Sequence, residues 1–156
     1  MRLHALSLVT ALVLIAGVHS ASAQDVRGIT FGGVTGDANG QQFPAFGGGV
    51  LVDLGQPWVS AGAQGEGFVS WPYFAGRAAL FGQGNLAPGK PVRPFVLAGV
   101  GLGEYSGPMF GGGVEFRPPQ QRVGFRVAVE DYTIRYQRFD GGTTHHQVGL
   151  HVGVIF

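Results

Sequence analysis

Glutamate and arginine side chains stand singly inside segments that are otherwise apolar or rich in glycine. The candidates are Glu66, Arg77, Glu115, Arg126 and Glu130. An isolated charge that leaves water is costly, so buried charges must be paired and hydrogen-bonded. Such a set can form a path for protons or ions, or a structural network of ion pairs. We expect the network, with Arg126 near Glu115 and Glu130 and with Arg77 near Glu66.

Histidines offer a second possible chemistry, metal binding. His145, His146 and His151 are the histidines that follow residue 23. Metal sites need about three or four donors that converge on one point, whereas neighbouring residues on a strand point in opposite directions. A partial site of His145 with Asp140 is the alternative. We expect no metal, and we expect His151 to be a hydrogen-bonded interior residue.

Nucleophilic catalysis has little support in the sequence. The serines after residue 23 are Ser60, Ser70 and Ser106, and none has a histidine nearby in the sequence. A triad can still assemble from distant strands. The glycine alternation over 99–103 lacks the following helix that dinucleotide binding requires. We therefore predict a protein that is not an enzyme and uses no cofactor.

The C-terminal segment predicts a strand with one apolar face. Apolar side chains recur at every second position between small or polar residues, and Ile155 is the exception on the second face. The apolar series is Val148, Leu150, Val152, Val154 and Phe156. A strict period of two over nine residues indicates a strand. The last strand of a soluble β-sandwich is the alternative to a membrane strand.

The N-terminal segment predicts a signal peptide over residues 1–23. Arg2 precedes an apolar run from Leu6 to Val18, and Ala21-Ser22-Ala23 fits the small-x-small cleavage rule. The run is shorter than the roughly 20 residues that a membrane span needs, so an uncleaved anchor helix is the weaker alternative. We expect export through the Sec pathway and a mature domain over residues 24–156. The absence of cysteine excludes a lipid-modified cysteine and disulfides.

Composition restricts the class of the mature domain. The chain carries 10 Lys and Arg against 9 Asp and Glu, a balance that argues against a nucleic-acid partner. The sequence after residue 23 has no long apolar helix, and a closed β-barrel is then the remaining structure that satisfies every backbone group in lipid. The 29 glycines suit a narrow, tightly coiled barrel. They alternate with Val, Leu and Phe, which disfavours a disordered low-complexity chain.

Alternation and turn residues divide the mature chain into eight expected strands. Their ranges are Asp25–Val34, Phe46–Leu54, Trp58–Ser70, Tyr73–Gly82, Phe95–Gly103, Met109–Arg117, Val123–Gln137 and the terminal segment. A polar loop is expected over Thr35–Phe43. Outer-membrane barrels have even strand numbers from eight upward. The sequence therefore predicts an all-β fold, an eight-stranded antiparallel up-and-down transmembrane barrel.

The alternation also predicts which side chains face lipid. Val123, Phe125, Val127 and Val129 share one face of a strand, and Arg126 and Glu130 lie on the other. An arginine that faces lipid at mid-membrane costs about 2–4 kcal/mol, so the charges should face a lumen that side chains fill. Aromatic residues near strand ends are expected to form interfacial girdles, and they are Trp58, Trp71, Tyr73, Tyr105, Tyr132, Tyr136 and Phe156.

The order of four segments is similar to a known family. These segments are Arg93–Gly101, Gly111–Arg117, Arg126–Tyr132 and the strand that ends on Phe156. They resemble the OmpA-like and OmpX-like eight-stranded outer-membrane β-barrels, and more closely the Gly-rich group of that superfamily. The resemblance implies a Gram-negative origin, a location among outer-membrane lipids, and escort by periplasmic chaperones. It also implies insertion by the barrel-assembly machinery through the terminal strand.

The predicted function follows from these expectations. We expect a small outer-membrane barrel with a plugged polar lumen and a role in membrane integrity or surface contact, with an unknown surface partner. The alternatives are a narrow porin-like channel and a lipocalin-like barrel that binds a ligand in its lumen. A lipid A-modifying enzyme is a weaker alternative.

Overall fold

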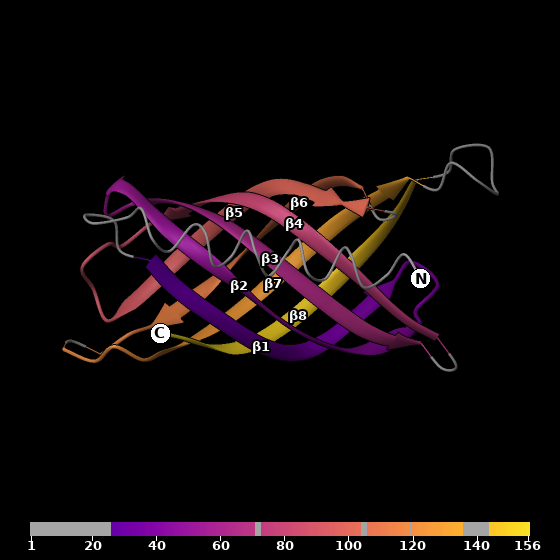
Figure 1. Cartoon of the computed structure of the whole chain (residues 1–156), viewed down its shortest axis with the longest axis horizontal. Helices are drawn as coiled ribbons and strands as arrows, with labels where there is room; N and C mark the ends of the chain where they lie inside the picture. Colours follow the sequence, from indigo (N-terminus) through magenta and orange to yellow (C-terminus); the bar gives the residue numbers. More distant parts are fainter. Residues whose placement is uncertain (1–25, 71–72, 104–105, 119, 136–143) are drawn as a thin grey trace, which may run out of the picture.

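The computed structural model describes residues 26–70, 73–103, 106–118, 120–135 and 144–156. Its eight strands form one closed barrel in which each strand pairs with the next in sequence (Figure 1). They are β1 (Val26–Asp37), β2 (Gln42–Gln56), β3 (Val59–Ser70), β4 (Tyr73–Asn85), β5 (Val92–Leu102), β6 (Gly107–Phe116), β7 (Gly124–Arg135) and β8 (Thr144–Ile155). The expected all-β, eight-stranded antiparallel fold is confirmed.

The first and last strands close the barrel. β1 pairs antiparallel with β8 from Ile29 opposite Ile155 to Asp37 opposite Gln147. Two further backbone hydrogen bonds join Gly28 and Phe156, at 2.7 and 3.0 Å. The start of β1 and the C-terminus therefore lie at the same end of the barrel (Figure 1). The proposed signal peptide, residues 1–23, lies outside the described residues.

The strands extend further than the turn signals indicate. The expected loop Thr35–Phe43 is wrong, because β1 continues to Asp37 and β2 begins at Gln42. The Asp37 carboxylate accepts hydrogen bonds from the backbone amides of Asn39 and Gln41, which holds the chain in a tight turn between the two strands. Local side-chain hydrogen bonding of this kind is a property of Asp in turns.

Prolines inside the strands lie at positions where the strand is paired with a neighbouring strand on one side only. Pro44 pairs with Val34, and the pairing of β2 with β3 begins one residue later. Pro94 and Pro108 occupy equivalent positions in β5 and β6, one residue outside the pairing with β4 and β7 respectively. Proline cannot donate a ladder hydrogen bond, so it is tolerated at such edges. The prolines therefore mark strand margins and not the loops that sequence patterns suggested.

The outward face of the barrel is apolar, as the alternation predicted. Val129 is 48% exposed and Leu150 is 52% exposed, whereas their neighbours Glu130 and His151 are 2% and 3% exposed. The four apolar residues assigned outward over 123–129 are all exposed, as is Phe156. None of the described segments forms a helix of the length and apolarity that a membrane span requires.

The inward face is mixed and not uniformly polar. Apolar side chains from several strands are buried inside, among them Ile29, Leu51, Phe81, Phe95, Leu97, Met109 and Ile155. Tyr132 is 1% exposed, so its expected place in an interfacial girdle is wrong. Its position, two residues after Glu130 on β7, turns it inward with that residue. Trp71, Tyr105 and Tyr136 lie outside the described residues.

Inward-facing glycines allow neighbouring strands to approach closely. A Cβ on Gly113 would collide with the carbonyl oxygen of Val127 and lie 2.8 Å from the ring of Phe95. Gly65 faces outward, and a Cβ there would meet nothing within 4 Å. The interior therefore requires glycine at position 113 for steric reasons that do not apply at position 65.

This contrast gives a prediction for stability. Gly113→Ala should destabilise the barrel by about 1–3 kcal/mol, the range for inserting a methylene group into packed surroundings. Gly65→Ala should cause no loss, because its methyl group has free space and alanine is less flexible when unfolded. The midpoint of urea unfolding in lipid vesicles measures both. Equal effects of the two substitutions would contradict the steric explanation.

Candidate functional site in the barrel interior

Polar and charged side chains inside the barrel form two clusters. The proximal cluster lies toward the end of the barrel where β1 begins and β8 ends, and it consists of Arg27, Asp53, Ser60, Gln83, Asn85, Glu115 and Arg126. The distal cluster lies toward the opposite end and consists of Thr35, Gln64, Glu66, Arg77, Glu130, Tyr132, Gln147 and His151. Every strand except β5 contributes to at least one cluster.

Glu115 is the centre of the proximal cluster. Its side chain is fully buried, and its two oxygens form ion pairs with different arginines, Oε1 with Arg126 at 2.5 Å and Oε2 with Arg27 at 3.2 Å. Gln83 donates to Glu115 and accepts from Arg126, so the amide completes a closed set of hydrogen bonds. The Arg126 guanidinium also lies 3.8 Å from the centre of the Phe95 ring. Together these contacts satisfy both oxygens of Glu115, whereas Nη2 of Arg126 and Nε of Arg27 are buried without a described hydrogen-bond partner.

Arg27 connects the proximal cluster to the end of the barrel. Its Nη2 donates to Asp53 and, at 2.8 Å, to the Ser60 hydroxyl, and that hydroxyl donates to Asp53 at 2.6 Å. Asp53 retains 25% exposure of its side chain. Both hydrogen-bonding directions of the Ser60 hydroxyl are therefore occupied by Arg27 and Asp53, and no histidine is among its described partners.

Arg77 is the cation of the distal cluster. Its Nε and Nη2 atoms lie 2.8 and 2.7 Å from the same oxygen of Glu66. It also donates to Gln147 and Thr35, and its guanidinium stacks 3.5 Å from the centre of the Tyr132 ring. The structure thus brings together Arg77 and Glu66, two residues that the sequence analysis placed near each other.

Glu130 borders the same small cavity as Arg126 and takes its described contacts from other residues. Its Oε2 atom accepts hydrogen bonds from Gln64 and from the Tyr132 hydroxyl, and it lies 3.7 Å from Nδ1 of His151. The described contacts include no ion pair between Glu130 and Arg126, although both border one small cavity. They lie four positions apart on β7, with Glu130 in the distal cluster and Arg126 in the proximal cluster.

Several members of the network were missed by sequence reasoning. Arg27, Asp53, Gln83 and Asn85 were not assigned, and His151 was assigned to the interior without named partners. Arg27 was obscured because its own face of β1 continues with the apolar Ile29 and Phe31. Arg27 lies two positions before Ile29, and residues two positions apart on a strand face the same side. That spacing is the signal that could have identified Arg27 as an interior residue. The cross-strand partners could not be read from one sequence.

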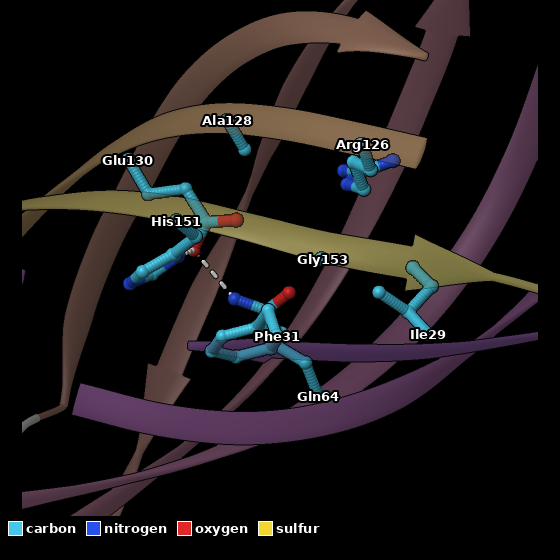
Figure 2. A pocket seen from close by; sticks show the side chains of 8 residues that line it. All are labelled: Ile29, Phe31, Gln64, Arg126, Ala128, Glu130, His151 and Gly153. Atoms are coloured by element: carbon cyan, nitrogen blue, oxygen red, sulfur yellow. Dashed lines mark hydrogen bonds and ion pairs between the residues drawn. The ribbon is translucent and has the colours of Figure 1, made fainter. Parts of the chain in front are cut away.

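A cavity of about 10 Å³ separates the two clusters (Figure 2). Arg126, Ala128 and Glu130 reach it from β7, His151 and Gly153 from β8, and Ile29, Phe31 and Gln64 from β1 and β3. This volume is near the roughly 10–15 Å³ that one water molecule requires. Within the part of the chain that the structure describes, no group of three or more acidic or histidine side chains has the arrangement of a metal site.

The C-terminal apolar series lies on the outside of β8 and just beyond it. Val148, Leu150 and Val152 are about half exposed. The ring of Phe156 covers Gly28 of β1, where a Cβ would lie 2.5 Å from the ring. The terminal aromatic residue therefore packs across the seam that closes the barrel.

Solved structures with the same architecture are known. Neisserial surface protein A matches with a TM-score of 0.62 and 11% identity over 86% of this chain and 96% of that chain. The N-terminal β-barrel domain of Pseudomonas aeruginosa OprF matches with a TM-score of 0.59 and 15% identity over 84% and 96%. A de novo designed transmembrane β-barrel matches with a TM-score of 0.52 and 11% identity over 83% and 95%. Neither a protein-family model nor a curated protein sequence matches the chain.

These likenesses agree with the closed barrel described above. The chain has the fold of the eight-stranded outer-membrane β-barrels of the OmpA and OmpX type. At 11–15% identity, the comparisons establish the fold and leave the function to be argued from this chain's own residues.

The proximal cluster gives a second prediction. Glu115→Gln should destabilise the barrel by about 3–5 kcal/mol, because it leaves two buried arginines without their shared carboxylate. The control is Asp131→Asn at an exposed pair with His146, with side chains 41% and 57% exposed. Exposed pairs contribute about 0–1 kcal/mol. Urea unfolding of both variants measures the difference, and a small effect of Glu115→Gln would contradict the assigned role.

Proposed function

We propose that the chain is an integral outer-membrane β-barrel that has a structural role and no catalytic activity. The observation that carries this proposal is the distribution of side chains across the wall of the barrel. Large apolar residues are exposed on all eight strands, whereas the arginines of the two clusters point inward and each is paired with a carboxylate. An apolar exterior around the whole circumference is stable in lipid and unfavourable in water.

A soluble carrier barrel is the alternative that this distribution disfavours. Soluble proteins rarely expose apolar patches larger than a few hundred Å². The exposed apolar side chains include Val34, Phe46, Val69, Phe74, Leu80, Val96, Phe110, Val114, Val127, Val129, Leu150 and Val152. A carrier would also need an interior cavity for its ligand, typically about 300 Å³ or more, and the cavity between the clusters measures about 10 Å³.

The interior network supports a closed lumen. Side chains fill the interior of an eight-stranded barrel. Here the Arg27–Glu115 ion pair cross-links β1 and β6, which are not neighbours, and the other arginine pairs join neighbouring strands. A conducting path would require these pairs to separate. We therefore favour a lumen sealed by ion pairs over a narrow channel.

A contact role at the cell surface belongs to the same proposal. β1, β3, β5 and β7 end at the side of the barrel opposite the start of β1 and the end of β8, which is the external side if those two strand ends face the periplasm. The turn after β1 is short, since β1 ends at Asp37 and β2 begins at Gln42. This supports a role within the membrane more than a large binding surface at that turn. One structural neighbour is named as a surface protein of Neisseria.

Assembly would follow the route of other outer-membrane barrels. We propose that periplasmic chaperones carry the exported chain and that the barrel-assembly machinery recognises the terminal apolar series of β8. Its outward side chains and the position of Phe156 at the seam support that proposal.

The membrane assignment predicts the effect of a charge on the outer face. Val129→Arg should lower the yield of folded barrel in lipid vesicles, because an arginine facing lipid near the midplane costs about 2–4 kcal/mol. Gln121→Arg, in the exposed turn between β6 and β7, is the matched control and should fold normally. The fraction that migrates as folded protein on an unheated gel measures both. Wild-type protein that stays monomeric in detergent-free buffer would overturn the assignment.

The closed lumen predicts the absence of conductance. Wild-type barrel in a planar bilayer should give no resolved single-channel steps under conditions in which a reconstituted porin conducts. Steady conductance by the wild-type barrel would favour the narrow channel and would leave the membrane assignment intact.

A further inference from the structure

The distal cluster contains two buried carboxylates and one arginine. Glu66 and Glu130 are 4% and 2% exposed, and Arg77 is 5% exposed. Arg77 contacts Glu66 directly and has no described ion pair with Glu130. The two arginines of the proximal cluster are already paired, Arg27 with Asp53 and Arg126 with Glu115. The charge of Glu130 therefore lacks a compensating arginine among the described ion pairs.

His151 lies between these two carboxylates. Its Nε2 atom is 3.4 Å from Oε1 of Glu66, and its Nδ1 atom is 3.7 Å from Oε2 of Glu130. The ring is buried, and it stacks on Phe31 with a centroid separation of 4.6 Å. Gly149, two residues earlier on β8, leaves room for the imidazole, because a Cβ there would lie 2.7 Å from Nε2. The fold thus holds the ring between the two carboxylates with one nitrogen nearest each, and both ring nitrogens are buried without a described hydrogen-bond partner.

The hydrogen-bonding capacity of imidazole distinguishes between its charge states. A neutral ring has one N–H donor and one lone pair. Ionised carboxylates only accept hydrogen bonds, and Glu66 and Glu130 already accept from Arg77 and from Gln64 and Tyr132. A neutral His151 would therefore direct a lone pair at one of the two carboxylates. The doubly protonated imidazolium instead directs a donor at each.

We propose that His151 is the second cation of the distal cluster, an imidazolium that bridges Glu66 and Glu130 and makes the distal half of the barrel sensitive to pH. Loss of its proton leaves two buried carboxylates and one arginine in the cluster. The other titratable or charged groups that face the ring are Arg77 on β4, Tyr132 on β7 and, across the small cavity, Arg126 on β7. β1 contributes the apolar ring of Phe31 at this contact.

The direct test is the protonation of the two ring nitrogens in the wild-type protein. Full-length chain labelled with ¹⁵N-histidine is refolded in detergent micelles, and the ring-nitrogen signals are recorded in mildly alkaline buffer. An ordinary imidazole, with a pKa of about 6.5, is neutral there. The His151 signals, identified by their loss in His151→Gln, should have the imidazolium pattern. The pattern of a single neutral tautomer would overturn the proposal.

A double-mutant cycle separates charge from packing. His151→Gln should increase the equilibrium constant for unfolding by about 100-fold or more, as when one partner of a buried ion pair is removed. Adding Glu130→Gln should recover at least tenfold of that loss, because it removes the carboxylate left without a partner. The control cycle uses His146→Gln and Asp131→Asn at the exposed pair, where no coupling is expected. Additive losses at His151 and Glu130 would overturn the bridging role.

The pH dependence has a definite sign. Wild-type stability should be greatest while His151 holds its proton and should fall as the pH rises through its titration. The His151→Gln/Glu130→Gln variant retains Tyr132 and Arg77 but lacks the proton-dependent pair, so its stability should not fall over the same range. A parallel alkaline loss in both proteins would assign the effect to another group.

Discussion

Closure of the sheet at the β1–β8 seam is the constraint on which the rest of this structure depends. A bilayer offers no hydrogen bonds to exposed backbone groups, and a sheet avoids unpaired edges only by closing. Here the seam runs from Ile29 to Asp37 on β1, and backbone hydrogen bonds of Gly28 with Phe156 extend it. Once eight strands close, their number fixes a narrow interior, and alternation fixes which side chains enter it.

The narrow interior explains the positions of both glycine and charge. Tightly coiled strands bring carbonyl groups close to the inward positions of their neighbours, as at Gly113 beside Val127 and at Gly153 beside Thr30. The same lack of space prevents bulk water from solvating the charges that alternation turns inward. Each carboxylate must then find its partners on other strands, as Glu115 does with Arg27 and Arg126. The ion pairs are thus a consequence of closure.

The fold could be predicted from sequence because its signal repeats along every strand. The period of two on β7 and β8 identified the outward face, and charges placed among apolar residues identified the inward one. Strand ends were less accessible: the polar residues over Thr35–Phe43 suggested a loop, although β1 continues to Asp37 and β2 begins at Gln42. Tyr132 was assigned to a girdle by residue type, although its spacing from Glu130 turns it inward.

The individual contacts of the interior could be predicted only in part. Arg77 opposite Glu66 and Arg126 opposite Glu115 are direct cross-strand pairs between consecutive strands, for which the register follows from the connecting turn. Arg27 and Glu130 also have partners on strands that are distant in sequence, Glu115 on β6 and Gln64 on β3, and these contacts depend on strand tilt and closure. One sequence gives no measure of either. Contacts across the lumen therefore require the three-dimensional structure.

The ion pairs also help to specify the register of strand pairing, a role that their net contribution to the free energy of unfolding does not measure. Replacing a buried ion pair with apolar residues is often neutral or stabilising, so stability alone does not explain the charges. A shift of one residue in strand pairing moves every side chain to the other face. In β7 such a shift would place Arg126 and Glu130 in lipid and Val127 and Val129 in the lumen. An interior of apolar residues would tolerate that error, because both faces would then be alike. The charged interior therefore distinguishes the correct register from its nearest competitor, and this argues that the clusters specify the barrel as much as they stabilise it.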